Sequence, residues 1–513
     1  MKKQFVIFAV ILFVIFLLRL PSLYEPFWYG DEGIFAAVGR NLNHGGVLYQ
    51  TAWDNKPPMI YLTYAAIFKF FGVSMFWLRL ATVIVVLSTA TVIYEIAQAT
   101  LGIKRALVAT FIFGFLTSLR LVEGNLALTE IFMILPICLA MLVAIKRLPA
   151  GRQGNFDLVS LFGAGFLFAI ASLYKQVGAL EAAALGVFLF LISKNFAEFF
   201  KKGLVLTIGF VIPYAATVSY FASKNLVSDY IFAAYTYYRI YLGESPKYAL
   251  LINVLKFLPI IAAIFYGFYK TTGAHPRGAQ SHSLTHPGGE VKSLRLDVFH
   301  LFLLWTAFSF LGSYFSGRTY GHYLIQAIVP VSLLAASVNI PQGLRKIQIV
   351  FALFFFVPLI FLTKLLFTDF LSGGPINQIT YFQNFVAFAS GRKSLDTYND
   401  YFDQNVNSVM GLTDFLRLKG AFGKSIYIWG NYPWLYAITD AKNPSRYVTS
   451  FHVFGVPSGQ NEVATNLQNN PPDYIIKPPS SIGYFPELEK LITTNYTLVA
   501  KIENSQVFVR QGQ

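Results

Sequence analysis

The sequence is dominated by a succession of long apolar runs that are separated by short basic segments. Because an α-helix rises about 1.5 Å per residue, about 20 apolar residues are enough to cross the hydrocarbon core of a bilayer. About eleven runs approach that length, which predicts an all-α polytopic membrane protein with about 11 transmembrane helices. The predicted spans cover residues 4–20, 78–98, 106–120, 127–145, 158–173, 177–193, 203–223, 249–269, 298–315, 321–339 and 347–367.

The placement of the basic residues predicts the orientation of the chain. The formal net charge is +15, yet only 13% of the residues are charged, and many of the basic ones lie in short connections between apolar runs. These connections contain Lys2/Lys3, Lys104/Arg105, Lys146/Arg147/Arg152, Lys194/Lys201/Lys202, Lys270 to Arg295 and Arg345/Lys346. This is the positive-inside pattern rather than a continuous basic surface, so nucleic acid is not an expected partner. We expect a multi-pass plasma membrane protein with a cytoplasmic N-terminus and the lipid bilayer as its surroundings.

A change of composition near residue 370 predicts two domains. Residues 1–370 are expected to form the membrane module, and residues 371–513 a soluble extracytoplasmic α/β domain. In that domain, residues 498–502 and 506–510 flank a short polar turn and predict a β-hairpin. Within the membrane module, residues 271–297 are rich in Gly, Pro, Ser and His, which predicts a flexible cytoplasmic loop.

The first external loop, residues 21–77, holds the densest group of chemically useful side chains. Asp31 and Glu32 precede a short helical stretch that Gly45 and Gly46 end. A purely structural interpretation is available, because aspartate is favoured where a helix begins. A carboxylate that caps a helix is also a positioned one, so both roles stay open for Asp31.

The second half of this loop reads Asp54-Asn55-Lys56-Pro57-Pro58 and continues into an apolar helix over residues 59–71. That helix is too short to span a bilayer, so we expect it, like the first, to lie along the membrane surface. Asp54 could serve only to make a turn before the prolines. In either case two carboxylates and a lysine are expected at the boundary between water and lipid.

Further polar residues are predicted on the same side of the membrane. Glu130 follows Thr129 at the mouth of a span, Lys175 lies at the tip between two spans, and Arg239 belongs to a tyrosine-rich loop. His322 and Tyr323 lie where a later span begins. Ionisable groups at membrane depth usually face a cavity or a partner, although side chains that reach for the surface, an aromatic belt or a helix-start hydrogen bond are the alternatives.

Carboxylates and cations on one membrane face suit sugar transfer from a polyprenyl phosphate. A phosphate leaving group departs as a stable anion, so it needs nearby positive charge rather than a general acid. One carboxylate to deprotonate the acceptor, together with Lys or Arg at the phosphate, is then sufficient. No ligand spacing demands a metal, so no cofactor is certain, although the carboxylates could hold a divalent cation.

Several motifs resemble those of a known family. Gly30-Asp31-Glu32-Gly33 and the segment from Asp54 to Pro58 resemble the first external loop of the GT-C glycosyltransferases. The similarity is greatest to the bacterial family related to the protein O-mannosyltransferases and the lipid A aminoarabinose transferase. Thr129-Glu130 resembles the family's second acidic position, which is usually Thr-Asp, and the segment from Gly321 to Leu324 resembles a later motif. The resemblance covers about residues 1–370.

This resemblance implies an inverting membrane glycosyltransferase that moves a sugar from a polyprenyl-phosphate donor to an extracytoplasmic acceptor, which is a protein, a lipid or a glycan. It assigns Asp31 as the catalytic base, with Glu32 and Glu130 as further catalytic candidates. The predicted ligands of the donor phosphate are Lys56, Lys175 and Arg239. The predicted substrate-binding residues are Asp54, His322 and Tyr323.

Two other functions compete with this prediction. A transporter or flippase of lipid-linked glycans is the first, but such proteins often show internal repeats and spans broken near the bilayer midplane, and the sequence shows neither. A membrane scaffold without catalytic activity, whose soluble tail binds partners, is the second.

Overall fold

The structure, a computed structural model, describes residues 2–145, 156–243, 298–315, 318, 320–337, 377–479 and 483–512. The spans predicted at 249–269 and 347–367 lie outside the described residues. So do the loop predicted at 271–297 and the domain boundary predicted near residue 370.

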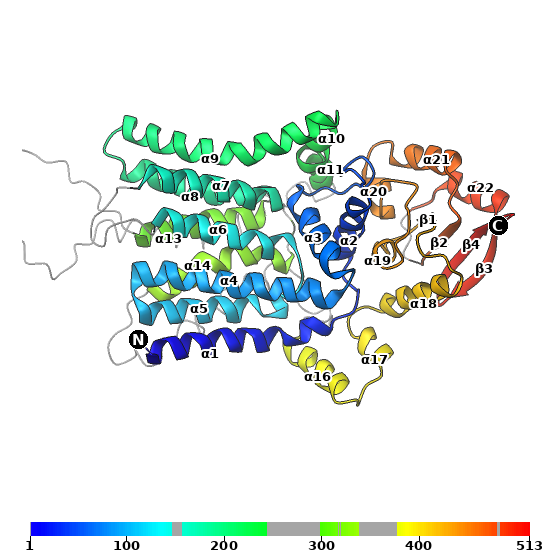
Figure 1. Cartoon of the computed structure of the whole chain (residues 1–513), viewed down its shortest axis with the longest axis horizontal. Helices are drawn as coiled ribbons and strands as arrows, with labels where there is room; N and C mark the ends of the chain where they lie inside the picture. Colours follow the sequence, from blue (N-terminus) through cyan, green and yellow to red (C-terminus); the bar gives the residue numbers. More distant parts are fainter. Residues whose placement is uncertain are drawn as a thin grey trace, which may run out of the picture.

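The described part of the chain is a bundle of long helices with a smaller α/β domain stacked on one end (Figure 1). Short helices of the first loop lie between the bundle and that domain. The helical elements up to residue 337 are α1 (Lys2–Arg19), η1 (Leu20–Tyr24), α2 (Gly30–Asn43), α3 (Met59–Phe71), α4 (Met75–Leu101), α5 (Ile103–Thr117), η2 (Arg120–Val122), α6 (Thr129–Ile145), α7 (Leu158–Tyr174), η3 (Gln176–Gly178), α8 (Ala179–Ile192), α9 (Phe196–Ser223), α10 (Val227–Ile231), η4 (Phe232–Thr236), α11 (Tyr238–Gly243), α13 (Val298–Tyr314), η5 (Gly321–Leu324) and α14 (Ile325–Ser337).

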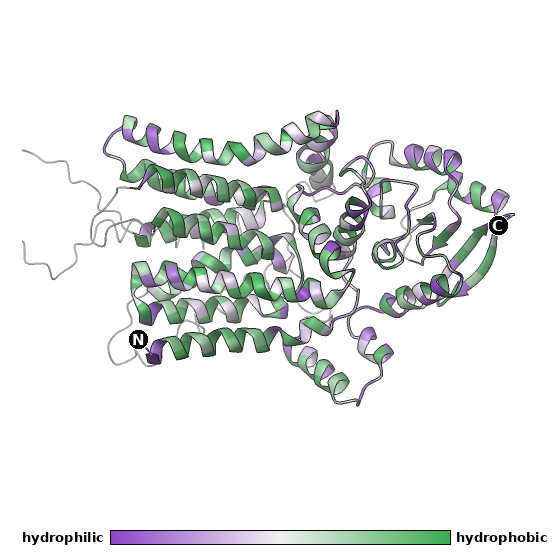
Figure 2. Ribbon diagram, viewed as in Figure 1, coloured by the Kyte–Doolittle hydropathy of each residue, from purple (hydrophilic) through white to green (hydrophobic). Residues whose placement is uncertain are grey.

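The bundle has the composition of a membrane domain. Among the described residues, three helices are long and apolar enough to cross a bilayer, namely Lys2–Tyr24, Met75–Leu101 and Phe196–Ser223. Shorter apolar helices accompany them, at Met59–Phe71, Thr129–Ile145, Leu158–Tyr174, Gln176–Ile192, Val298–Tyr314 and Gly321–Ser337. Figure 2 shows the bundle mostly in the colours of hydrophobic residues. Large apolar side chains are also exposed on its outer helices, such as Phe13 of α1 and Ile208 of α9. The predicted membrane location is therefore confirmed.

Small residues let the helices approach closely. A Cβ atom added to Gly165 in α7 would lie 2.0 Å from the carbonyl oxygen of Leu206 in α9. A Cβ atom added to Gly209 in α9 would lie 2.1 Å from the carbonyl oxygen of Phe162 in α7. Close backbone approach at small residues is how membrane helices gain packing contacts without a hydrophobic driving force.

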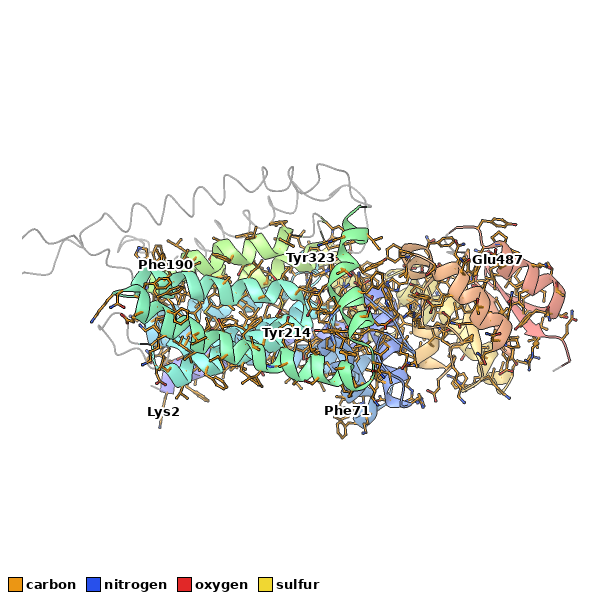
Figure 3. The ribbon with its side chains drawn as sticks, turned by 90° about the horizontal axis from the view of Figure 1, so that it is seen from above. Lys2, Phe71, Phe190, Tyr214, Tyr323 and Glu487 are labelled. Carbon is orange, nitrogen blue, oxygen red and sulfur yellow. The ribbon has the colours of Figure 1, made fainter. Side chains whose placement is uncertain are left out.

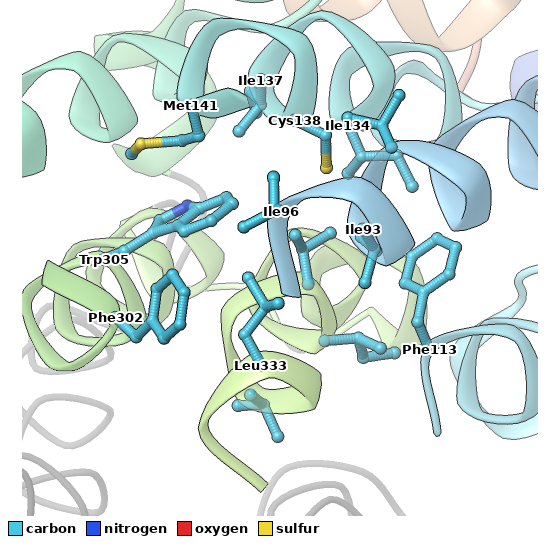
Figure 4. Close-up of a cluster of buried hydrophobic side chains, with 14 of the residues drawn as sticks. Ile93, Ile96, Phe113, Ile134, Ile137, Cys138, Met141, Phe302, Trp305 and Leu333 are labelled. Atoms are coloured by element: carbon cyan, nitrogen blue, oxygen red, sulfur yellow. The ribbon is translucent and has the colours of Figure 1, made fainter. Parts of the chain in front are cut away.

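A large apolar core fills the centre of the bundle. Figure 4 shows part of it, where side chains of α4, α6 and α13 meet around Ile93, Cys138 and Trp305. Cys138 is fully buried and unpaired. Its thiol packs as a small apolar group within this core.

The C-terminal domain contains a mixed four-stranded sheet in the order β1-β2-β4-β3. β1 and β2 are parallel, and β4 runs antiparallel to both β2 and β3. The helices and strands of this region are α16 (Gln378–Ala389), α17 (Leu395–Asp400), α18 (Asn405–Leu418), β1 (Ile426–Ile428), α19 (Trp434–Ile438), α20 (Ser450–Gly455), α21 (Gly459–Asn469), β2 (Tyr474–Lys477), α22 (Pro486–Asn495), β3 (Tyr496–Ile502) and β4 (Ser505–Arg510). The predicted hairpin is present as β3 and β4, with Ile502 opposite Ser505.

The first external loop and the C-terminal domain share one apolar core. Buried side chains of α2 and α3 pack in the same cluster as those of β1, β2 and α19. Gly33 of α2 lies so close to Trp434 that an added Cβ atom would sit 2.8 Å from the indole ring. The Trp434 indole also donates a 3.0 Å hydrogen bond to the carbonyl oxygen of Tyr29. The loop is thus built into the domain rather than only lying beside it.

Candidate active site

The N-terminus of α2 positions Asp31. The helix begins at Gly30, and Tyr29 rather than Asp31 occupies the N-cap. Asp31 is half-buried in the first turn, where the partial positive charge of the helix N-terminus stabilises a carboxylate.

Four of the predicted site residues, Asp31, Lys56, Glu130 and Lys175, lie within electrostatic reach of one another. The charges of Glu130, Lys56 and Asp31 all act on the Lys175 ammonium. The same groups, together with Asp54, act on the Tyr238 hydroxyl at the start of α11. Burial lowers the pKa of Lys175, while Glu130 has the opposite effect on it. Side chains of α2, the Lys-Pro-Pro segment and α6 therefore act electrostatically on Lys175, which lies between α7 and α8.

Glu130 and Lys175 form a buried ion pair at this point. The Lys175 ammonium contacts Oε1 of Glu130 and lies 3.5 Å from the centre of the Tyr323 ring. Thr129 donates a 2.8 Å hydrogen bond to the other oxygen of Glu130. The lysine is therefore held by a carboxylate and an aromatic face.

His322 approaches the same ion pair from η5, directly before α14. Its Nε2 atom lies 4.0 Å from Oε1 of Glu130, and its Nδ1 atom lies 2.6 Å from Oε2 of Glu123. The backbone amide of His322 also donates to that Glu123 oxygen, at 3.2 Å. His322 is thus held by Glu123, which agrees with the predicted hydrogen bond at the helix start and also brings the ring to the site.

The Asp54 segment is tied to the C-terminal domain. Asp54 is 2% exposed, and its Oδ2 atom accepts a 2.7 Å hydrogen bond from the Tyr61 hydroxyl. Its Oδ1 atom lies 3.4 Å from Nε2 of His452, a residue of α20. Two residues further on, the Lys56 ammonium donates a 2.8 Å hydrogen bond to the side chain of Asn55.

The carboxylates of this region differ in their partners. Among the described residues, Glu130 is paired with Lys175, Asp54 lies against His452, and Glu123 binds His322. Asp31 makes no hydrogen bond or ion pair with its side chain within that part of the chain. Among these four carboxylates, Asp31 is therefore the one without a side-chain partner in that part of the chain.

Comparison with known proteins identifies the fold. The family model described as dolichyl-phosphate-mannose-protein mannosyltransferase matches residues 55–221, a segment that contains Lys56, Glu130 and Lys175. A search of curated protein sequences finds no match. The structure of ArnT from Cupriavidus metallidurans bound to undecaprenyl phosphate is similar, with a TM-score of 0.61 and 15% identity. The alignment covers 100% of this chain and 99% of that one.

This chain has the GT-C fold. ArnT from the same organism in the apo state is similar as well, with a TM-score of 0.59 and 15% identity over 99% of this chain and 98% of that one. The oligosaccharyltransferase of Archaeoglobus fulgidus aligns at 12% identity and a TM-score of 0.44, covering 96% of this chain and 71% of that one. The relationship to the protein mannosyltransferases and to ArnT that the motifs predicted is confirmed.

Glu32 has a different setting from Asp31 in this GT-C chain. It is fully buried, and Arg79 of α4 donates to both of its oxygens, at 2.5 and 2.9 Å. The backbone amide of Ala127 donates to it as well, at 2.6 Å. Arg79 also bonds to Glu25, at 3.0 Å. The sequence analysis missed Arg79 and Glu25, although an arginine inside an apolar span is the signal that could have identified them.

The remaining predictions concern Arg239 and a metal. Arg239 lies on α11 directly after Tyr238, and its side chain is exposed. Within the described ranges, no group of three or more His, Cys, Asp or Glu residues could hold a metal ion. The divalent cation therefore stays a prediction.

Figure 3 places Tyr323 in the half of the bundle nearer the C-terminal domain, and Lys2 and Phe190 at the far end.

Proposed function

We propose that this chain is an inverting glycosyltransferase that moves a sugar from a polyprenyl-phosphate donor to an acceptor hydroxyl on the extracytoplasmic side. The observation that carries this proposal is the unpaired carboxylate of Asp31, set among the charges of Lys56 and Lys175. The full-length similarity to an ArnT structure with bound undecaprenyl phosphate supports the class of donor.

The reaction needs one base and no general acid. Asp31 accepts the proton of the acceptor hydroxyl, whose oxygen then attacks the anomeric carbon of the donor sugar. The bond between that carbon and the phosphate oxygen breaks, and its electron pair stays on the phosphate. Attack from the side opposite the leaving group inverts the anomeric configuration.

The cations stabilise the departing phosphate. Lys56 and Lys175 provide positive charge where the negative charge develops, and a buried setting strengthens that interaction. Glu130 keeps Lys175 in place, so its role is to position the lysine. Arg239, being exposed on α11, extends the positive charge towards the membrane surface. In this scheme Glu32 anchors α2 through Arg79 and takes no part in proton transfer.

The remaining predicted residues form the surroundings of the sugar. Tyr323 offers an aromatic face beside Lys175, and His322 lies next to Glu130. Asp54 fixes the segment that carries Lys56. The C-terminal domain covers this end of the bundle (Figure 1), which supports a part for this domain in receiving the extracytoplasmic acceptor.

The test is transfer activity of Asp31→Asn in proteoliposomes supplied with radiolabelled polyprenyl-phosphate sugars. The substitution keeps the size of the side chain and removes the base, so the rate is expected to fall about 10²–10⁴-fold. The matched control is Asp414→Asn in α18, where the carboxylate is 61% exposed and pairs only with neighbouring Arg417 among the described residues. Equal activity of both variants would refute the proposed base. Donor movement across the bilayer without any covalent product would favour the flippase instead.

A further inference from the structure

His452 belongs to the C-terminal domain but reaches the Lys56 segment. The residue lies in α20, and its imidazole is 3% exposed. Its Nε2 atom lies 3.4 Å from Oδ1 of Asp54, and the charges of Lys56 and Asp31 act on the same ring. A side chain 421 residues away from Asp31 in sequence is thus brought to the edge of the site.

The second ring nitrogen fixes the orientation of the imidazole. Nδ1 lies 3.2 Å from the hydroxyl oxygen of Thr449. That oxygen also accepts from the backbone amide of His452, so the hydroxyl proton is available to Nδ1. In the tautomer that accepts the Thr449 proton at Nδ1, the imidazole carries its own proton on Nε2, which faces the Asp54 carboxylate.

A continuous set of hydrogen bonds leads from Asp54 to Lys56. The Tyr61 hydroxyl donates to Oδ2 of Asp54 at 2.7 Å. The same hydroxyl oxygen accepts the backbone N–H of Lys56 at 3.1 Å, and the Tyr49 hydroxyl donates to the Lys56 carbonyl at 2.7 Å. The position of Lys56 therefore depends on the orientation of Asp54.

The contact with His452 is supported by Trp53, the residue directly before Asp54. The backbone amide of Trp53 donates a 2.8 Å hydrogen bond to the carbonyl oxygen of Arg446. The Trp53 indole also packs edge-on against the His452 ring, with 5.1 Å between the ring centres. The segment is held between two parts of the C-terminal domain, and His452 is the contact that reaches the carboxylate.

We infer that His452 is a positioning residue: through Asp54 and Tyr61 it holds Lys56 in the arrangement that binds the donor phosphate. The inference rests on the proposed function for the role of Lys56. It assigns to the C-terminal domain a part in assembling the donor site, in addition to any contact with the acceptor.

The test compares three substitutions in the full-length protein in nanodiscs. His452→Leu fills the space without a hydrogen-bond donor, and His452→Gln keeps an N–H group near the place of Nε2. His44→Leu is the matched control. His44 also contacts a carboxylate of the C-terminal domain, Asp440 at 2.7 Å, but is 54% exposed. Hydrogen exchange at the Lys56 backbone amide is measured by mass spectrometry. This measurement needs no polyprenyl-phosphate sugar, so it is independent of transfer activity.

His452→Leu is expected to speed exchange at Lys56 at least about tenfold, as the loss of a contact to a charged group predicts. It should raise the KM for the polyprenyl-phosphate donor by a similar factor and change kcat much less. In both the exchange rate at Lys56 and the donor KM, His452→Gln should stay within about threefold of the parent protein, and His44→Leu should match the parent protein. In an Asp54→Asn background, the further effect of His452→Leu should nearly vanish.

Unchanged exchange at Lys56 in His452→Leu would overturn the inference, and so would fully multiplicative effects with Asp54→Asn. Failure of the proposed function has a different signature. In that case the parent protein transfers no sugar from any polyprenyl phosphate, while the exchange rates still decide whether His452 positions Lys56.

Discussion

Replacing Arg79 by methionine removes the cation from a network in which every charged group is buried. Arg79, Glu25 and Glu32 each have side chains that are 0% exposed. Arg79 donates to Glu32, Glu25 and the carbonyl oxygen of Asn125. Breaking a buried ion pair in this way leaves an unpaired charge and costs about 3–5 kcal/mol of the free energy of unfolding.

The loss of Arg79 leaves Glu25 with more hydrogen-bond donors than Glu32. Glu25 keeps donors from Tyr381 at 2.5 Å and Asn125 at 2.7 Å, and Arg120 lies 3.5 Å away. Glu32 keeps the backbone amide of Ala127. Most of the loss therefore falls on Glu32, and Glu32→Gln combined with Arg79→Met should recover about 1–3 kcal/mol relative to the sum of the single variants.

The free energy of unfolding can be measured by denaturant titration in mixed micelles. Arg417→Met is the control, because Arg417 is 63% exposed and pairs with exposed Asp414, so less than about 1 kcal/mol should be lost. The reasoning would be refuted if Arg79→Met were as stable as Arg417→Met. It would also be refuted if the double variant lost the full sum of the two single losses.

Three further predictions concern the donor site, helix packing and pH. Lys175→Met should raise the donor KM at least about tenfold, whereas Lys69→Met, which changes an exposed lysine of α3, should leave the KM unchanged in the same transfer assay. Gly165→Leu should lower stability by about 1–3 kcal/mol because of the contact with Leu206, whereas Gly186→Leu, with open space around it, should not, as denaturant titration will show. Burial lowers the pKa of His452 below its usual value of 6.5. The charge of Lys56 acts in the same direction, whereas the carboxylates of Asp54 and Asp31 act to raise the pKa. The unfolded chain then takes up the proton first, so stability should fall as the pH drops below 6.5, and this part of the loss should be absent in His452→Gln.

Local pattern was sufficient to predict most of the elements. The helix predicted at 59–71 is α3, with the bounds Met59–Phe71, because hydropathy and the preceding prolines both mark its start. The hairpin of β3 and β4 followed from alternating apolar residues around a polar turn. The motifs also led to Asp31, Lys56 and Glu130, and the position of Lys175 at the tip between two spans led to that residue. The fold brings the four residues within electrostatic reach of one another.

Long-range pairing was not predictable in this way. Glu32 and Arg79 are separated by 47 positions, and Asp54 and His452 lie in different domains. Nothing in the neighbourhood of His452 in sequence distinguishes it from an ordinary buried histidine. Such contacts depend on which surfaces the packed helices and the C-terminal domain present to one another, and hydropathy carries no information about that.

The central claim is that Asp31, Lys56 and Lys175 form one donor site. The most direct measurement is an electron cryo-microscopy structure of the protein in nanodiscs with bound polyprenyl phosphate. The account predicts that the phosphate lies between the Lys56 and Lys175 ammonium groups, with the Asp31 carboxylate facing the side where the sugar is attached. Phosphate density at the opposite end of the bundle, or in contact with neither lysine, would contradict it.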